Sequence, residues 1–175
     1  LAVSPSILRG VWAAGQGIAS GVNRTLESVQ FGLGVDHPFY RANAERLPHV
    51  RRPYAWYVRV ADLPAFIRTI APALEARLER SLAAGHTGEL KLSFYRGGLR
   101  IALEAGRIRD VSHWEPDETW HVGYPGLTFL QVLFGHRTTD ELRTMHPDCL
   151  INDDDGKVLA DVLFPKQASR FWALT

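Results

Sequence analysis

This chain has almost no cysteine and no long apolar run. Cys149 is its one cysteine, which excludes a disulfide within the chain and any metal site built from several cysteines. No apolar stretch approaches the roughly 20 residues that a membrane span needs, and the chain does not open with the pattern of a signal peptide. A cytoplasmic setting is therefore the default expectation.

Net charge is also small. At +1, it favours neither nucleic acid nor an anionic membrane as a partner. Arginine supplies 17 of the 20 basic residues and lysine only three, a bias to which we attach no functional meaning. The 175 residues are 46% hydrophobic and 22% charged, as in an ordinary globular protein that is long enough to bury a core.

The segment 87–114 carries the clearest structural pattern. Apolar and polar residues alternate in it, as on strands with one covered face. Its inward set is predicted to be Leu90, Leu92, Phe94, Leu99, Ile101 and Leu103. Two turns interrupt it, at Arg96-Gly97-Gly98, where glycines can supply the positive φ of a tight hairpin, and at Ala105-Gly106. The pattern predicts a three-stranded antiparallel meander, with a bulge near Arg109-Asp110 because the apolar phase slips before Val111.

The part of the chain before this meander alternates helical and extended patterns. We predict a helix over 4–19, a strand over 27–33, a helix over 37–47 and a strand over 54–60. That order is typical of an α/β layer. Because the first residue is Leu rather than Met, we expect this part to be half of a domain whose beginning lies upstream.

A longer helix is predicted to follow Asp62, with an apolar face that continues as far as Leu82. Pro72 should kink this helix or divide it in two. Shorter elements are expected at 118–123 as a strand, and at 127–135, 139–146 and 157–164 as helices. The aromatic tail at 171–172 is expected to dock rather than fray.

Three groups of residues invite a chemical assignment, and each has a simpler structural explanation. Asn152–Gly156 is rich in carboxylates, but the first and twelfth positions of a calcium loop would be Ile151 and Val162, which cannot bind calcium. A polar turn that caps the next helix explains it better. The histidines show no i, i+4 pair, so we expect no metal site. Cys149 near His146 is interpreted as a bystander thiol.

Two glycine-containing stretches fail as cofactor loops. Gly32-Leu33-Gly34 follows a predicted strand, but His37 occupies the place of the third glycine of a dinucleotide fingerprint. The stretch 12–17 has the glycine spacing of an acetyl-coenzyme A loop, but Trp12 replaces its basic or amide residue. Tyr40 is of more interest, because a phenol just after a strand can serve as a general acid. A tyrosine packed by its own helix explains the same spacing.

A family pattern appears in the glycines at 32–34, in His37-Pro38-x-Tyr40 and in the stretch 53–63, PYAWYVRVADL. This sequence pattern resembles the C-terminal part of two-part bacterial N-acetyltransferases of the GNAT superfamily. In these, a sterol-carrier-protein-like domain follows the acetyltransferase module, as in the enhanced-intracellular-survival aminoglycoside acetyltransferases. The later matches are Leu90-x-Leu92-x-Phe94, Gly106-Arg107-Ile108, Leu127-x-x-Leu130-x-x-x-Phe134-Gly135, Leu163-Phe164-Pro165 and Trp172.

The resemblance implies an α+β protein with two parts. Residues 1–60 would be the end of the acetyltransferase module, and residues 61–175 a twisted antiparallel sheet backed by helices. Acetyl-coenzyme A would be the cofactor of the full-length parent, with its binding loop before Leu1, and no metal is implied. Tyr40 would protonate the leaving thiolate of coenzyme A, and the terminal carboxylate of Thr175 would help to deprotonate the amine. Asn43-Ala44 stands where the family has Phe-Gly.

The leading functional hypothesis is thus a C-terminal fragment of an acetyl-coenzyme A-dependent N-acetyltransferase, inactive alone. Its second domain would shape the site of a small-molecule amine acceptor, and its missing N-terminal half would be its main partner. An alternative is a module that binds a lipid or another small apolar ligand between the sheet and the helix at 127–134. A third option is a structural domain that self-associates through an exposed sheet edge.

Overall fold

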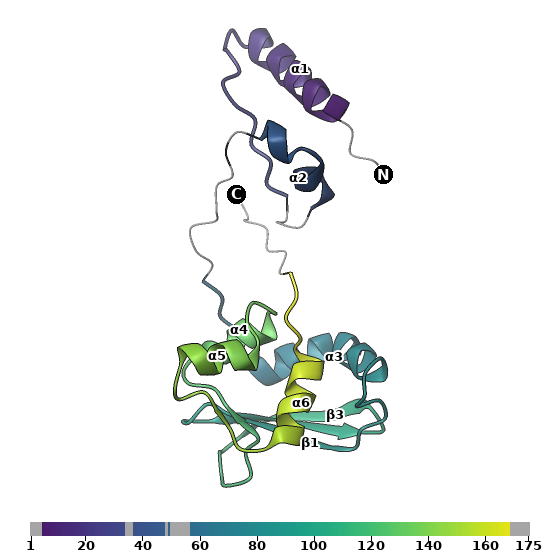
Figure 1. Cartoon of the computed structure of the whole chain (residues 1–175), viewed down its shortest axis with the longest axis vertical. Coiled ribbons are helices and arrows are strands. Elements are labelled where there is room, and N and C mark those ends of the chain that lie inside the picture. The colour runs from purple at the N-terminus through teal and green to yellow at the C-terminus, as the bar shows by residue number, and fades with distance from the viewer. Residues whose placement is uncertain (1–4, 34–36, 48, 50–56, 169–175) are drawn as a thin grey trace. The chain divides into compact units, whose positions relative to one another are not determined.

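The computed structural model describes residues 5–33, 37–47, 49 and 57–168. They belong to two compact units (Figure 1). The first unit contains the described residues up to 49 together with residue 168, and the second contains residues 57–167.

The first unit has two helices. Helix α1 spans Pro5–Gly21, two residues beyond the predicted end, and α2 spans Pro38–Ala42. His37 caps α2, since its Nδ1 accepts from the N–H of Phe39 at 3.2 Å. A 3-10 turn over Ala44–Arg46 follows, so the predicted helix over 37–47 is divided in two.

The predicted strand over 27–33 is wrong. Residues 24–33 have neither helical nor strand structure. A strand exists only when a neighbour pairs with its backbone, and the described residues of the first unit supply none. The same holds for residues 57–60 of the strand predicted over 54–60; its first three residues lie outside the described ranges.

The second unit is built on one five-stranded sheet. Its strands are β1 (Gly88–Ser93), β2 (Gly98–Glu104), β3 (Arg107–Trp114), β4 (Val122–Gly123) and β5 (Leu150–Ile151). They lie in the order β3-β2-β1-β4-β5. All neighbours are antiparallel except β1 and β4, which are parallel. The predicted antiparallel sheet thus contains one parallel pair, and β5 was not predicted.

The predicted meander is confirmed, together with its bulge. Ala102 pairs with Asp110 and Leu103 with Ile108, so Arg109 is the extra residue on β3. The turn prediction for the first hairpin is wrong in detail. Its positive φ, 67°, belongs to Tyr95 and not to a glycine. Gly98 is required for space instead, because a Cβ there would lie 2.7 Å from the Leu92 carbonyl oxygen.

Four helices cover one side of this sheet, as Figure 1 shows. They are α3 (Leu63–Glu79), α4 (Thr128–Leu133), α5 (Thr139–Met145) and α6 (Asp154–Leu163). The fold is therefore mixed α+β, as predicted, with a sheet backed by helices. No helix in the described ranges is both long and apolar enough to cross a membrane.

Polar caps fix the starts of three of these helices. The Asp62 carboxylate accepts from the Ala65 N–H at 2.9 Å, and Thr138 forms a capping box with Glu141. Asp153 accepts from the Gly156 N–H at 2.6 Å. This confirms a capping turn in the acidic stretch, although α6 starts three residues before the predicted position.

The structure excludes a division of α3 at Pro72, one of the two predicted alternatives, and corrects the prediction for Leu82. The helix runs without division through Pro72, because proline at this point costs one backbone hydrogen bond while the buried face on both sides holds the helix together. Leu82 was predicted to be core, but it is fully exposed. The helix ends at Glu79, so the helical spacing no longer applies to Leu82.

Candidate functional site

An apolar layer lies between the sheet and the helices, and aromatic side chains dominate it. Phe129, on α4, is only 2% exposed. Its ring centroid lies 5.5 Å from that of Phe94, 5.3 Å from Tyr124 and 5.4 Å from Phe164. Such tilted and edge-to-face pairs are favourable beyond their buried area. Phe129 is thus the centre of this layer, and the layer is filled by side chains.

Tyr124 anchors the same layer through its hydroxyl. This group hydrogen-bonds to the Thr139 hydroxyl at 2.8 Å, and both residues are fully buried. Burial raises the pKa of the Tyr124 phenol far above its usual value. The phenol therefore remains protonated and serves as a structural hydrogen-bonding group.

Helix α4 is the shortest of the four helices. It has six residues, and its N-terminus has no side-chain cap. Two glycines with left-handed backbone bracket it, Gly126 at φ 56° and Gly135 at φ 69°. A short uncapped helix gains little stability of its own, so tertiary contacts, above all those of Phe129, hold it in place.

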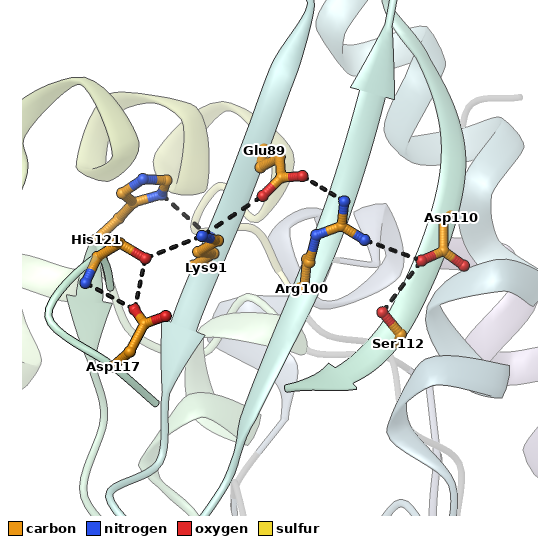
Figure 2. A network of polar contacts seen from close by, with 8 residues as sticks. Glu89, Lys91, Arg100, Asp110, Ser112, Asp117 and His121 are labelled. Carbon is orange, nitrogen blue, oxygen red and sulfur yellow. Dashed lines mark hydrogen bonds and ion pairs between the residues drawn. The ribbon is translucent and has the colours of Figure 1, made fainter. Parts of the chain in front are cut away.

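The opposite face of the sheet carries a network of charged groups (Figure 2). Arg100, on β2, contacts Glu89 on β1 and Asp110 on β3, the latter at 3.2 Å. The hydrogen bond from Arg100 holds the pKa of the Glu89 carboxyl below its usual value. These cross-strand pairs stabilise the register of the meander.

Lys91 extends this network toward the loop before β4. Its ammonium donates to the Thr119 hydroxyl at 2.9 Å and lies 3.6 Å from Glu89 and 5.6 Å from the centroid of Trp114. Its backbone N–H donates to Nδ1 of His121 at 3.1 Å. Burial lowers the pKa of His121, which keeps Nδ1 free to accept. Because Lys91 is held on all these sides, it is a structural cation rather than a free nucleophile.

Two open surface hollows of the described residues have linings that do not include the aromatic layer under α4. One, of about 490 Å³, is lined by Asp140, Arg143, Thr144, Pro147, Cys149, Leu150 and Ile151. The other, of about 450 Å³, lies between the second half of α1 and residues 24–28. Cys149 is buried, and burial raises the pKa of its thiol to about 11. Its protonated thiol fits the prediction of a bystander.

Tyr40 lies where its hydroxyl is already engaged by backbone groups. It donates to the carbonyl oxygen of Phe31 at 2.7 Å, and it accepts from the N–H of Leu33 at 3.0 Å. These bonds join α2 to the extended segment before it. The other predicted site residue, Thr175, lies outside the described ranges, so the prediction that the two act at one site is not tested by the structure.

No group of three or more potential metal ligands occurs among the residues that the structure describes. The acidic stretch at 152–156 acts through the Asp153 cap. Sequence reasoning missed the cross-strand network of Arg100 and the missing side-chain N-cap of α4. The first could have been found from opposite charges at paired positions of the predicted meander.

The chain was compared with known proteins. No family model and no curated protein matches it. Among solved structures, it is similar to one described as the crystal structure of sterol carrier protein 2, at 16% identity and a TM-score of 0.34, over 57% of this chain and 96% of that chain. A likeness at that score carries no argument about ligand or activity. No comparison supports the acetyltransferase part of the predicted architecture.

Proposed function

We propose that residues 57–167 form a module that binds a small apolar ligand, such as a fatty acyl chain, between the sheet and α4. The observation that carries the proposal is the way in which Phe129 is held. It occupies the centre of the aromatic layer, yet it belongs to a six-residue helix without a side-chain N-cap. The layer is therefore covered by a short helix that has no side-chain N-cap.

The energetic cost of opening sets the size of the ligand. Displacing α4 exposes Phe129, Val132 and Leu133, its buried side chains, at roughly 2 kcal/mol each, or on the order of 6 kcal/mol in all. Each buried methylene of a ligand contributes about 0.8 kcal/mol of favourable binding free energy. About eight methylenes are then needed to offset the opening, and further methylenes contribute toward the cost of association itself.

The chemistry of this unit supports binding rather than catalysis. The thiol of Cys149 is buried and protonated, and the Tyr124 hydroxyl is tied to Thr139. Lys91 is surrounded by its partners. None of these groups has the exposed, activated state that a nucleophile or general base needs.

Binding is tested by titrating the full chain with cis-parinaric acid, a fluorescent polyene fatty acid, and by competition with saturated fatty acids. Dodecanoate should displace the probe and hexanoate should not. Phe94→Asp puts a charge at the half-buried edge of the layer and should lower the affinity about tenfold or more. Leu82→Asp, at a fully exposed position, is the matched control. A Phe94→Asp variant that is folded and binds like the wild type contradicts the proposal.

A second candidate function is the one that the family resemblance implies, the C-terminal part of an N-acetyltransferase that uses acetyl-coenzyme A. One observation favours it. Helix α1 has a single charged residue, Arg9, in 17 positions. Its apolar side chains Ile7, Val11, Trp12 and Ile18 are exposed. A helix with so few charges is usually covered by other parts of a protein on several sides. This supports the view that α1 is part of a larger module.

The test is acetyl-coenzyme A turnover by the full-length parent on a panel of amines. Tyr40→Phe should lower kcat by about 10² if the phenol is the general acid, and removal of Thr175 should lower it if the terminal carboxylate takes part. Tyr57→Phe, at an exposed tyrosine, is the control. A parent with no turnover on any amine contradicts this function and leaves the ligand-binding proposal to its own titration.

A further inference from the structure

The two edges of the sheet differ in how their backbone groups are used. On the outer edge of β3, the Ile108 N–H donates to Glu75 at 2.9 Å, and Arg68 donates to the Val111 carbonyl oxygen. Both partners are side chains of α3. This edge is therefore closed to a further strand, as natural sheets close an edge to prevent unwanted pairing.

The outer edge of β5 is open. Asn152 donates its N–H to His121 at 2.9 Å, and Val122 is paired with Ile151. Backbone groups of successive strand residues point to opposite sides, so Leu150 and Asn152 face β4, and the N–H and C=O of Ile151 face outward. In the described part of the chain, nothing hydrogen-bonds to these two groups.

A hollow lies beside this edge, and its residues define what fits. Ile151 lines the hollow of about 490 Å³, although its side chain packs on the core. Arg143, on α5, is the cation of the lining. Its nearest carboxylate, Asp140, lies 3.9 Å away and is held more closely by Lys157, at 2.8 Å. Arg143 is thus free to pair with an incoming anion.

We infer that an extended peptide segment with an acidic residue between two apolar residues adds to β5 as an antiparallel strand. The acidic residue lies opposite Ile151 and exchanges both backbone hydrogen bonds with it. Side chains of opposed residues point to the same face of a sheet, so the acidic side chain lies on the helix-covered face, toward Arg143. The flanking apolar side chains point to the other face, where Leu150 is exposed.

The test uses the full chain and a capped pentapeptide, acetyl-Thr-Val-Glu-Val-Thr-amide, in an NMR titration. The amide signals of residues 149–152 should shift, with a Kd of about 0.1–1 mM for so few contacts. The same peptide with its glutamate N-methylated cannot donate to the Ile151 carbonyl and should bind about tenfold more weakly. A peptide with lysine in place of glutamate should also bind weakly.

Reversal of the charge at Arg143 distinguishes the proposed geometry from non-specific peptide binding. Arg143→Glu should lower the affinity for the glutamate peptide and raise the affinity for the lysine peptide, each by about fivefold or more. Arg109→Glu, at the bulge on the opposite edge, should change neither. The inference is overturned by the absence of binding at about 2 mM, by equal binding of the N-methylated peptide, by shifts confined to other residues, or by no exchange of preference in Arg143→Glu.

Discussion

Replacement of Phe129 by alanine probes the aromatic layer most severely. Phe→Ala in a protein core costs about 3–5 kcal/mol. Phe129 is 2% exposed and touches three aromatic rings, so we expect about 4 kcal/mol. With a urea m-value of roughly 2 kcal/mol/M, the unfolding midpoint should fall by about 2 M.

Equilibrium unfolding in urea, followed by tryptophan fluorescence and circular dichroism, measures this loss. Leu82→Ala is the control and should change the free energy of unfolding by less than about 0.5 kcal/mol. Benzene should restore part of the lost stability in Phe129→Ala, because an empty apolar cavity binds it. A loss below about 1.5 kcal/mol, or no effect of benzene, would refute the assignment of Phe129 as the centre of the layer.

Two further predictions concern Glu75 and Gly156. The pKa of Glu75 lies below its usual 4.5, chiefly because Arg107 hydrogen-bonds to the carboxylate. The stability that it contributes is thus present above that pH and is lost as pH falls through the lowered pKa. Glu75→Gln should flatten the loss of stability between pH 5 and about 3 in urea unfolding, and an unchanged slope would contradict this. Gly156→Ala should cost about 1–3 kcal/mol by calorimetry, because a Cβ there would lie 2.4 Å from Cβ of His121; a neutral effect would contradict it.

Local patterns in the sequence were enough to predict the meander, the bulge and the capping turn at 152–156. The alternation over 87–114 is confirmed because each of these strands pairs with its sequence neighbour. Asp62 and Thr138 act as caps because capping requires only the next three residues. In such cases the contacts that decide the structure lie within a few residues or one hairpin.

The sequence could not predict elements that depend on distant partners. Strand β5 has two residues and exists because it pairs with β4. The segment 27–33 alternates like a strand, but the described residues offer it no neighbour. The left-handed backbone of Tyr95 was also missed. The sequence pattern assigned the positive φ to the glycines at 97 and 98, but Gly98 is needed because a side chain has no space there.

The candidate site was predicted in part. An apolar cavity was expected between the sheet and the helix at 127–134, but the rings of Phe94, Tyr124, Phe129 and Phe164 fill this space in the structure. The missing N-cap of α4 and the left-handed glycines on either side of it were not foreseen, because they become visible only in the folded chain. The roles of Tyr40 and Thr175 stay predictions, which acetyl-coenzyme A turnover would test.

Amide hydrogen exchange of the full chain, with and without dodecanoate, tests the ligand-binding account most directly. Amides of α4 should exchange through a local opening, faster than those of α3 and β1, and dodecanoate should slow them selectively. The account is contradicted if α4 exchanges only with the global unfolding of its unit and dodecanoate leaves its amides unprotected.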